Sequence, residues 1–309
     1  GEFVPAHQAV IHSYMRERYA APGRMILGSD SHTRYGAYGT MAIGEGGPEL
    51  ARQLLQKTYD IAYPKVIAIY LTGAPRPGTG PQDVALALIG ATFREGIVKN
   101  AVMEFFGPGV ASLSMDYRSG IDVMTTETAC LSSVWSTDGI TKDHLERLGR
   151  GDQFQAQAPG EGAYYDALIQ VDLSTVEPMI ALPFHPSNAY PIREFKANLA
   201  DLLHQVDVDA AEQLGIKNAP SLTRKIVNGQ FQVDQGVIAG CSGGTYQNLV
   251  RAAEILGSHP IGSGEFWLSC YPGSMPINLE LTKKGYIASL MAAGASIRSC
   301  FCGPCFGAG

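Results

Sequence analysis

Short apolar runs alternate along the chain with longer segments in which apolar residues recur every three or four positions. Continuous apolar runs rich in β-branched residues indicate strands buried on both faces of a parallel sheet. The predicted strands are 25–27, 66–71, 101–106, 169–173, 178–183, 237–241 and 266–270. The helical spacing predicts helices over 44–57, 81–96, 121–135, 192–214, 246–256 and 279–293. This alternation indicates an α/β fold, with mainly parallel sheets between layers of helices.

The composition is that of a folded protein with a substantial core. Apolar residues make up 45% of the 309 positions and charged residues 17%, which excludes a disordered or fibrous chain. The net charge of −6 argues against nucleic acid as a partner and against a basic membrane-binding patch. The longest apolar runs are far too short to span a bilayer. Three of the six cysteines crowd into 300–305, which is typical of a metal or redox site in a reducing compartment. We therefore predict a protein of the cytoplasm or an organelle matrix, with no nucleic-acid and no membrane partner.

Cysteine spacing points to a metal centre. Cys302 and Cys305 lie on a Gly-Pro turn, and Cys241 follows an apolar run sixty-one residues before Cys302. Two close thiolates and a third from elsewhere suit a soft metal, and three ligands would leave one metal position open for substrate. A thioredoxin-type redox pair would be expected early in a small domain, at the start of a helix. A zinc site would need Cys300 crowded beside Cys302 as a fourth ligand. We therefore favour a metal-binding loop for these cysteines, and a zinc site and a thiol redox pair stay open as alternatives.

A second group of candidate residues follows the predicted strand 25–27. Asp30, Ser31 and His32 place a carboxylate, a hydroxyl and an imidazole at a strand end, where open α/β sheets present their ligand-binding groups. A simple capped turn is the structural alternative for His32. Glu127 stands in an apolar segment, and a buried carboxylate needs a partner. Pairing with a histidine would poise it for proton transfer near neutral pH.

Other histidines and cysteines have simpler structural interpretations. His12 lies in an amphipathic segment and is expected to be buried and hydrogen-bonded. His185, between two prolines, is equally compatible with a structural and a functional role. Cys130 and Cys270 are predicted in the core, and His144 and His204 are predicted on helix surfaces.

Taken together, these motifs resemble the aconitase family of iron–sulfur hydro-lyases, over essentially the whole chain. The likeness is greatest to a bacterial branch described only as hydratases. The matching segments are 28–33, 64–73, 81–84, 107–110, 241, 271–274 and 302–305. Their order and spacing agree as well as their residues, so the match is more specific than any single motif.

The resemblance implies three-layer α/β/α aconitase-like domains. Residues 1–66 would end a first domain, 67–184 would form a second, and 185–309 an incomplete third that carries the cysteines. The chain is then expected to be one section of a larger protein. A swivel domain and an N-terminal segment would lie elsewhere on the full-length chain.

The resemblance also implies a [4Fe–4S] cluster on Cys241, Cys302 and Cys305, whose open iron binds a small-molecule carboxylate substrate. The implied catalytic residues are His12, eighteen residues before the Asp, then Asp30, His32 and Glu127, with Ser31 binding substrate. The iron would act as a Lewis acid on the leaving hydroxyl, and a His–carboxylate pair would supply the proton. We therefore expect an iron–sulfur-dependent hydratase or dehydratase acting on a small hydroxy-carboxylate.

Two departures from the family pattern leave the particular hydroxy acid open. Val123 stands where the family usually has an asparagine, and Gly243 replaces another beside the first cysteine. A non-catalytic iron–sulfur or zinc-binding protein, sensory or structural, is the alternative, and a thiol redox module is a second. The family's further arginines and serine base have no match here, and Arg34 and Arg298 are the only arginines expected near the site. We expect this section alone to be inactive.

Overall fold

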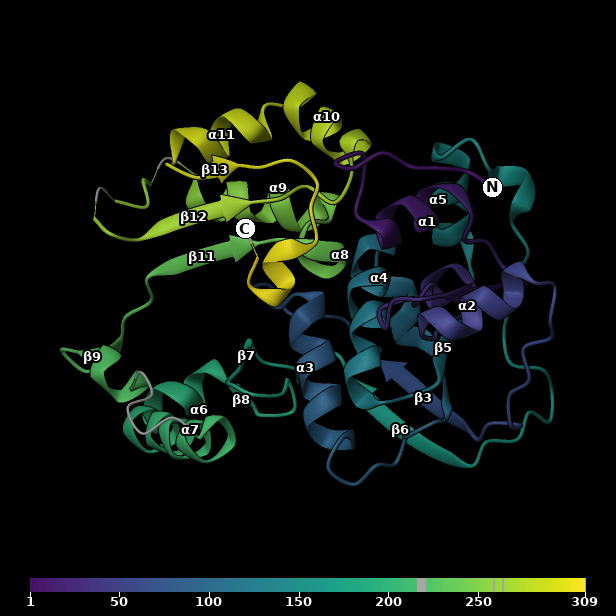
Figure 1. The fold of residues 1–309 in the computed structure, drawn as a ribbon, viewed down its shortest axis with the longest axis horizontal. Coiled ribbons are helices and arrows are strands. Elements are labelled where there is room, and N and C mark those ends of the chain that lie inside the picture. Colours follow the sequence, from purple (N-terminus) through teal and green to yellow (C-terminus); the bar gives the residue numbers. More distant parts are fainter. Residues whose placement is uncertain (216–220, 258, 263, 309) are drawn as a thin grey trace.

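The computed structural model describes residues 1–215, 221–257, 259–262 and 264–308 (Figure 1). Its largest sheet has four strands in the order β5–β4–β3–β6, and all neighbours are parallel. The strands are β3 (Val66–Thr72), β4 (Val102–Phe106), β5 (Ser132–Trp135) and β6 (Ala167–Asp172). In the central strand β3, Ile67 lies opposite Met103 on one side and Ala167 on the other. Ile67, Ala68 and Ile69 are all buried, so both faces of β3 are covered, which explains its continuous apolar run.

Helices pack against this sheet and close a continuous apolar core. They are α3 (Pro81–Thr92), α4 (Met115–Met124) and α5 (Gly139–Arg147). Figure 1 shows α3 and α4 running beside β3. The core includes Trp135, whose ring stacks on Phe105 with centroids 4.3 Å apart. At the start of α3, Asp83 accepts a hydrogen bond from the Gly80 amide at 2.6 Å and so caps the helix.

The N-terminal part supplies a short helix and a two-stranded parallel sheet. Its elements are α1 (Ile11–Arg18), β1 (Met25–Gly28), β2 (Met41–Gly44) and α2 (Gly47–Leu54). The loop after β1 lies tightly against the end of β2, because a Cβ on Gly44 would stand 2.2 Å from the Asp30 carbonyl oxygen. Only glycine allows this approach, which holds the loop carrying Asp30 in place.

The C-terminal part is a second α/β unit. Strands β11 (Gln235–Ile238), β12 (Trp267–Cys270) and β13 (Ser296–Ile297) are parallel. Helices α9 (Tyr246–Leu256), α10 (Met275–Lys283) and α11 (Tyr286–Ala292) pack together beside them (Figure 1). Leu249, Leu281 and Leu290 form its fully buried centre.

A smaller unit with its own apolar cluster lies between these two in sequence. It contains β7 (Met179–Ala181), β8 (Ala189–Pro191), α6 (Ile192–Ala197), α7 (Leu199–Leu214), β9 (Ile226–Val227) and β10 (Gln230–Phe231). The remaining elements are α8 (Gly240–Gly243) and the 3₁₀ helices η1 (Gly36–Tyr38), η2 (Pro108–Ser112), η3 (Thr125–Thr128), η4 (Gly151–Gln153), η5 (Leu222–Lys225) and η6 (Gly303–Phe306).

The predicted helix over 121–135 is wrong. Helix α4 ends at Met124, a 3₁₀ turn follows, and the chain becomes strand β5. Threonine hydroxyls explain the break: Thr125 donates to the Asp122 carbonyl at 2.6 Å and Thr128 to the Thr125 carbonyl at 2.7 Å. Such local bonds compete with helix propagation. Ala129 then adopts φ +60°, which reverses the chain before β5.

Two other predicted helices are each divided. The helix predicted over 279–293 is split at Gly285, whose φ of +82° ends one helical path and starts another. Helix 192–214 breaks at Asn198, which separates α6 from α7. By contrast, the bounds of α9 agree with the predicted 246–256.

The predicted fold class is confirmed, because the larger sheets are parallel and alternate with helices. The domain boundaries stay a prediction, and the division after residue 66 falls within β3. Among the described residues, no helix is long and apolar enough to cross a membrane.

Candidate active site

Three cysteines come together although two separate segments supply them. Cys241 lies in α8, directly after β11, whereas Cys302 and Cys305 belong to the turn that ends the described chain. The Cys305 amide donates to the Cys302 carbonyl at 3.1 Å, which sets the spacing within the turn. A Cβ on Gly240, whose φ is +78°, would lie 2.5 Å from the Cys305 sulfur. Glycine at this position therefore permits the turn to approach the Cys241 loop.

An apolar patch and a buried arginine support Cys241. The side chains of Val10, Val123 and Cys241 pack together, with Cys302 at the edge of this cluster. Arg16 is 5% exposed and donates to the Cys241 carbonyl oxygen at 2.7 Å. Helix α1 thus fixes the backbone that presents the first thiol.

The three thiols differ in environment. Burial raises the pKa of Cys241 to about 11. The interaction between Cys302 and Cys305 raises the pKa of Cys302 and lowers that of Cys305. Cys241 is buried, Cys302 half-buried and Cys305 exposed, so the set opens toward solvent on one side.

The donor set suits an iron–sulfur cluster better than a single ion. In the described part of the chain, no three His, Cys, Asp or Glu side chains gather closely enough to hold one metal ion. Cysteine thiolates are the soft donors that iron–sulfur clusters use, and Cys241 packs with Cys302, which interacts with Cys305. Cys130 and Cys270 lie in two different apolar cores, as predicted for small core residues. Cys300 is buried as well.

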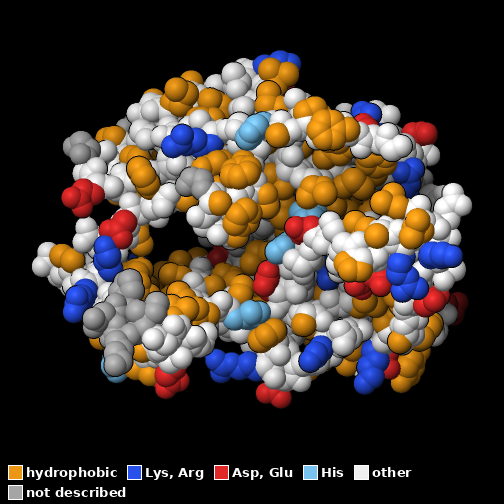
Figure 2. Space-filling model, viewed as in Figure 1, with side chains coloured by type: hydrophobic (Ala, Val, Ile, Leu, Met, Phe, Trp, Pro, Cys, Tyr) orange, Lys and Arg blue, Asp and Glu red, His pale blue; other side chains and the backbone are white. Residues whose placement is uncertain are grey.

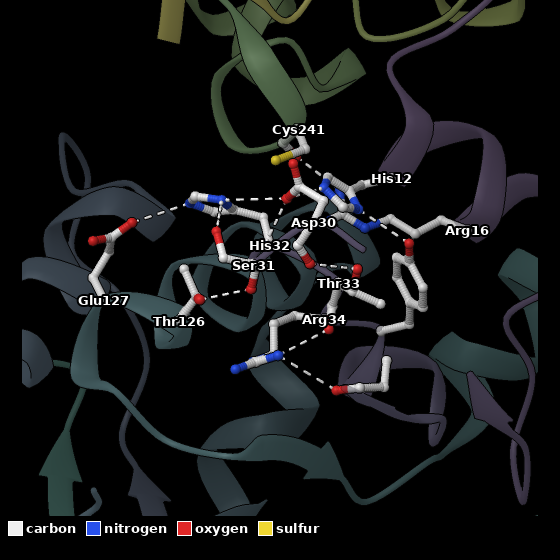
Figure 3. A network of polar contacts seen from close by, with 12 residues as sticks. His12, Arg16, Asp30, Ser31, His32, Thr33, Arg34, Thr126, Glu127 and Cys241 are labelled. Atoms are coloured by element: carbon white, nitrogen blue, oxygen red, sulfur yellow. Dashed lines mark hydrogen bonds and ion pairs between the residues drawn. The ribbon is translucent and has the colours of Figure 1, made fainter. Parts of the chain in front are cut away.

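A chain of polar contacts fixes the carboxylate of Asp30 (Figure 3). His12 is 1% exposed, and its Nε2 lies 2.9 Å from Oδ1 of Asp30. Its Nδ1 lies 3.0 Å from the Tyr35 hydroxyl. Because an ionised carboxylate only accepts, His12 donates from Nε2, and the Tyr35 hydroxyl donates to Nδ1. The His32 amide also donates to Asp30 Oδ1, at 2.7 Å.

A second contact joins His32 to Glu127. His32 Nε2 lies 3.1 Å from Oε1 of Glu127, the hydrogen bond expected from the sequence. Thr126 donates to the Ser31 carbonyl at 2.6 Å and ties the turn carrying Glu127 to the loop after β1. Glu127 is only half-buried, less than its apolar segment predicts, because it lies in a 3₁₀ turn. In Figure 3, the His32 ring lies between Glu127 and Asp30, and Cys241 stands above Asp30.

The two histidines differ in protonation. Burial, followed by the charge of Arg16, lowers the pKa of His12 to about 4, so His12 is neutral. The hydrogen bond with Glu127 raises the pKa of His32, and the same bond lowers the pKa of Glu127. Burial alone would raise the pKa of Asp30, but the His32 amide and His12 outweigh it and lower the pKa. The site therefore pairs an ionised Asp30 with a neutral His12, and an ionised Glu127 with a readily protonated His32.

Figure 2 shows histidine and acidic side chains gathered in a hollow near the middle of one face, beside hydrophobic side chains. The exposed fractions agree with an accessible site: 45% for the Asp30 side chain, 37% for His32 and 28% for Glu127. Ser31 is exposed beside them. His12, in contrast, is too buried to touch a ligand.

Sequence reasoning missed three supporting residues. Arg16 lies four positions after His12, and this helical spacing could have placed both on one face of α1. Tyr35 had no local signal. Asp122 is fully buried, and its Oδ1 accepts from Ser133 and from the Trp135 indole at 2.9 Å, which braces α4 against β5.

Of the two arginines expected near the site, Arg34 does not provide a free cation. Arg34 is buried and donates to backbone carbonyls, including that of Cys130 at 2.9 Å. Arg298 is exposed. The prediction that His144 lies on a helix surface is wrong, because it is half-buried and lies 2.9 Å from the Tyr38 hydroxyl. His204 is exposed, as predicted.

The fold and the site define a class: an α/β protein that presents three thiols opposite a histidine–carboxylate network. The family model described as "Aconitase family (aconitate hydratase)" matches residues 1–309, and the chain belongs to this family. It is 31% identical over 309 residues to the mitochondrial aconitate hydratase of Schizosaccharomyces pombe, covering 96% of this chain and 36% of the relative. It is 30% identical over 302 residues to the 3-isopropylmalate dehydratase large subunit of Elusimicrobium minutum, covering 97% of this chain and 64% of that subunit. The chain thus spans about a third of the length of the aconitate hydratases it matches.

Proposed function

We propose that this chain is the cluster-carrying section of an iron–sulfur-dependent hydro-lyase that acts on a small hydroxy-carboxylate. The observation that carries the proposal is the approach of Cys241 to Cys302 and Cys305 on the side where Asp30 and His32 are exposed. The family match supports hydration or dehydration chemistry, since the relatives are named as a hydratase and a dehydratase.

In this proposal Cys241, Cys302 and Cys305 hold a [4Fe–4S] cluster. When bound through three thiolates, such a cluster leaves one iron open and supplies Lewis-acid polarisation of a substrate hydroxyl.

The protein's own residues would then handle the proton. His32 donates to Glu127 through Nε2, so Nδ1, which lies 3.3 Å from the exposed Ser31 hydroxyl, would be the atom that serves a substrate. Protonated His32 would release its Nδ1 proton to the departing hydroxyl, which leaves as water, and Glu127 would stabilise the charged ring before transfer. In the reverse direction the neutral ring would take that proton back from water. The proton on carbon needs a separate base, which we assign to the remaining domains.

Asp30 and His12 would have different tasks. Asp30 Oδ1 lies 3.6 Å from His32 Nδ1, so its charge favours a proton on that atom. His12 is buried and would act through Asp30, whose carboxylate it orients. Ser31, exposed beside them, would bind substrate. These residue roles form part of the proposal. The proposal also places a swivel domain and an N-terminal segment on the full-length chain, and the protein in the cytoplasm.

Anaerobic reconstitution with iron and sulfide tests the metal assignment. Cys241→Ala, Cys302→Ala and Cys305→Ala should each reduce iron content and visible absorbance, whereas Cys270→Ala, in the core of the same unit, should retain both. Stoichiometric zinc without visible absorbance would favour the zinc-binding alternative. A reversible Cys302–Cys305 disulfide without bound metal would favour the redox module. Retention of the cluster in all three site variants would refute the ligand assignment.

A further inference from the structure

His185 lies beside Glu127 and has no role in the reaction proposed above. Its Nε2 is 4.0 Å from Oε2 of Glu127, whereas Nε2 of His32 is 3.1 Å from Oε1. The two oxygens of one carboxylate therefore face two different imidazoles. The side chains of Glu127 and His185 are 28% and 36% exposed, so this arrangement lies at the edge of the accessible site.

The position of His185 is well defined. It lies in the loop that joins β7 to β8, and this loop is braced by a bond from the Leu182 amide to the Asn188 carbonyl at 2.8 Å. The His185 ring stacks on Phe93 with centroids 3.9 Å apart and an interplanar angle of 23°. Phe93 ends α3, and α3 packs against both the β7–β8 hairpin and the 3₁₀ turn that carries Glu127. Helix α3 therefore contacts the elements that carry both His185 and Glu127.

The hydrogen bonds of His185 define its tautomer. The Ser187 amide donates to Nδ1 at 3.1 Å, and the Ser187 hydroxyl lies 3.0 Å from the same atom. A backbone amide can only donate, so Nδ1 carries the lone pair. The proton of the neutral ring is therefore on Nε2, the nitrogen that faces Glu127.

A carboxylate between two imidazoles could either bind a metal ion or accept two hydrogen bonds. Metal binding would need the lone pair of His185 on Nε2, but that lone pair is directed to Ser187. The described residues also contain no three ligating side chains arranged around one ion. The geometry therefore favours two imidazole N–H groups that face one carboxylate, one in a hydrogen bond at 3.1 Å and one in a longer polar contact at 4.0 Å.

We propose that His185 is a positioning residue: its Nε2–H faces Oε2 of Glu127 across 4.0 Å, and this polar contact helps to keep Oε1 on His32. The terminal torsion of a glutamate is broad, so one hydrogen bond alone leaves the carboxylate free to rotate. The Nε2–H of His185, which faces Oε2, restricts rotation of the Glu127 carboxylate. The effect on turnover rests on the proposed function, whereas the arrangement of the two imidazoles around Glu127 does not.

Two variants separate the donor from the loop structure. In His185→Asn, the side-chain oxygen can still accept from the Ser187 amide, as Nδ1 does, but the side chain is too short to reach Glu127. In His185→Gln, the terminal amide can replace the Nε2 donor. Asp30, which faces His32 at 3.6 Å, is unchanged in both.

Long-range ¹H–¹⁵N spectra of the 309-residue chain provide a readout that does not depend on activity. We expect His185 to be protonated on Nε2 and unprotonated on Nδ1. His185→Asn should weaken the Glu127–His32 bond and move the pKa of His32 down toward its ordinary value, and His185→Gln should keep it raised. Protonation of His185 on Nδ1, or an unchanged His32 pKa in His185→Asn, would overturn the proposal. Zinc titration that perturbs Nε2 of both histidines would overturn it in favour of a metal site.

Turnover then tests the catalytic consequence in the longer protein with its cluster. His185→Asn should lower kcat about fivefold at most, the effect of a partly exposed polar pair, with KM unchanged, and His185→Gln should recover it. A KM effect alone would contradict the positioning role. If the spectra behave as expected but no hydratase activity exists, the proposed function fails and the positioning of Glu127 by His185 stands.

Discussion

Glu127→Gln keeps the size of the side chain and removes the charge that faces His32. The carboxylate lies 3.1 Å from His32 Nε2, and the two side chains are 28% and 37% exposed. Solvent therefore screens the pair more than a buried ion pair and less than a fully exposed one. We expect the substitution to reduce the free energy of unfolding by about 1 kcal/mol, near the upper end for exposed pairs.

The sign of the pH dependence follows from the two pKa shifts. His32 has a raised pKa, so its contribution is fully present below its ordinary value of 6.5 and is lost as the pH rises through the folded pKa. Glu127 has a lowered pKa, so its contribution is present above its ordinary value of 4.5 and is lost as the pH falls through the folded pKa. The stability difference should be largest near pH ~5.5 and disappear in alkaline solution.

Urea denaturation from acid to alkaline pH, together with an NMR titration of His32, measures both quantities. Glu127→Gln should lower the His32 pKa and reduce activity about 10²-fold or more if His32 is the proton donor. Glu146→Gln is a matched control, because Glu146 faces Lys142 at 3.8 Å on an exposed helix surface. An unchanged His32 pKa in Glu127→Gln, or a stability difference that does not vary with pH, would refute the reasoning.

Three further predictions concern the cysteine site and the section as a whole. Arg16→Leu removes the donor to the Cys241 carbonyl and should cost about 1–3 kcal/mol in urea denaturation, with faster loss of a reconstituted cluster. Gly240→Ala should lose visible absorbance because the new Cβ meets the Cys305 sulfur, whereas Gly285→Ala, with a similar φ but open space, should retain it. The 309-residue chain alone should show no hydratase activity even with a full cluster, since a missing carbon-side base and a missing carboxylate clamp cost about 10²–10⁴-fold each. Measurable turnover by this section would place the base among its own residues.

Helices and strands are predicted well from the sequence where a single pattern of apolar residues, helical or strand-like, dominates a segment. The apolar run of β3 and the amphipathic spacing of α9 are examples, and both appear close to the predicted bounds. It fails between Ile121 and Trp135, where the residue pattern suits a helix but threonine hydroxyls bind the local backbone instead. Whether a threonine hydroxyl bonds to the local backbone depends on its position in three dimensions, which amino-acid composition does not reveal.

For the site, local motifs locate the loops but not their supports. The turn containing Asp30 and His32 is visible as a motif, and the bond from His32 to Glu127 agrees with the expectation for a lone carboxylate. The contacts of Tyr35 with His12 and of Arg16 with the Cys241 carbonyl span 23 and 225 residues of sequence. Such contacts depend on how sheets and helices pack, so one sequence without its fold does not reveal them.

The residues that contact His12 and His32 explain why these two neighbouring histidines differ in protonation. Tyr35 donates to Nδ1 of His12, and this bond needs a lone pair that a protonated ring would lack. Burial acts in the same direction, so His12 stays neutral, in agreement with its proposed task of orienting Asp30. His32 has no such donor fixed on Nδ1 by a buried partner, and Glu127 favours its charged form. The proposed mechanism therefore assigns the exchangeable proton to one atom, Nδ1 of His32, which lies 3.6 Å from Oδ1 of Asp30 and 3.3 Å from the Ser31 hydroxyl. A general acid needs its proton at a defined atom, and its ring must take up a new proton after each transfer. The Glu127 carboxylate favours that uptake because it stabilises the charged ring of His32.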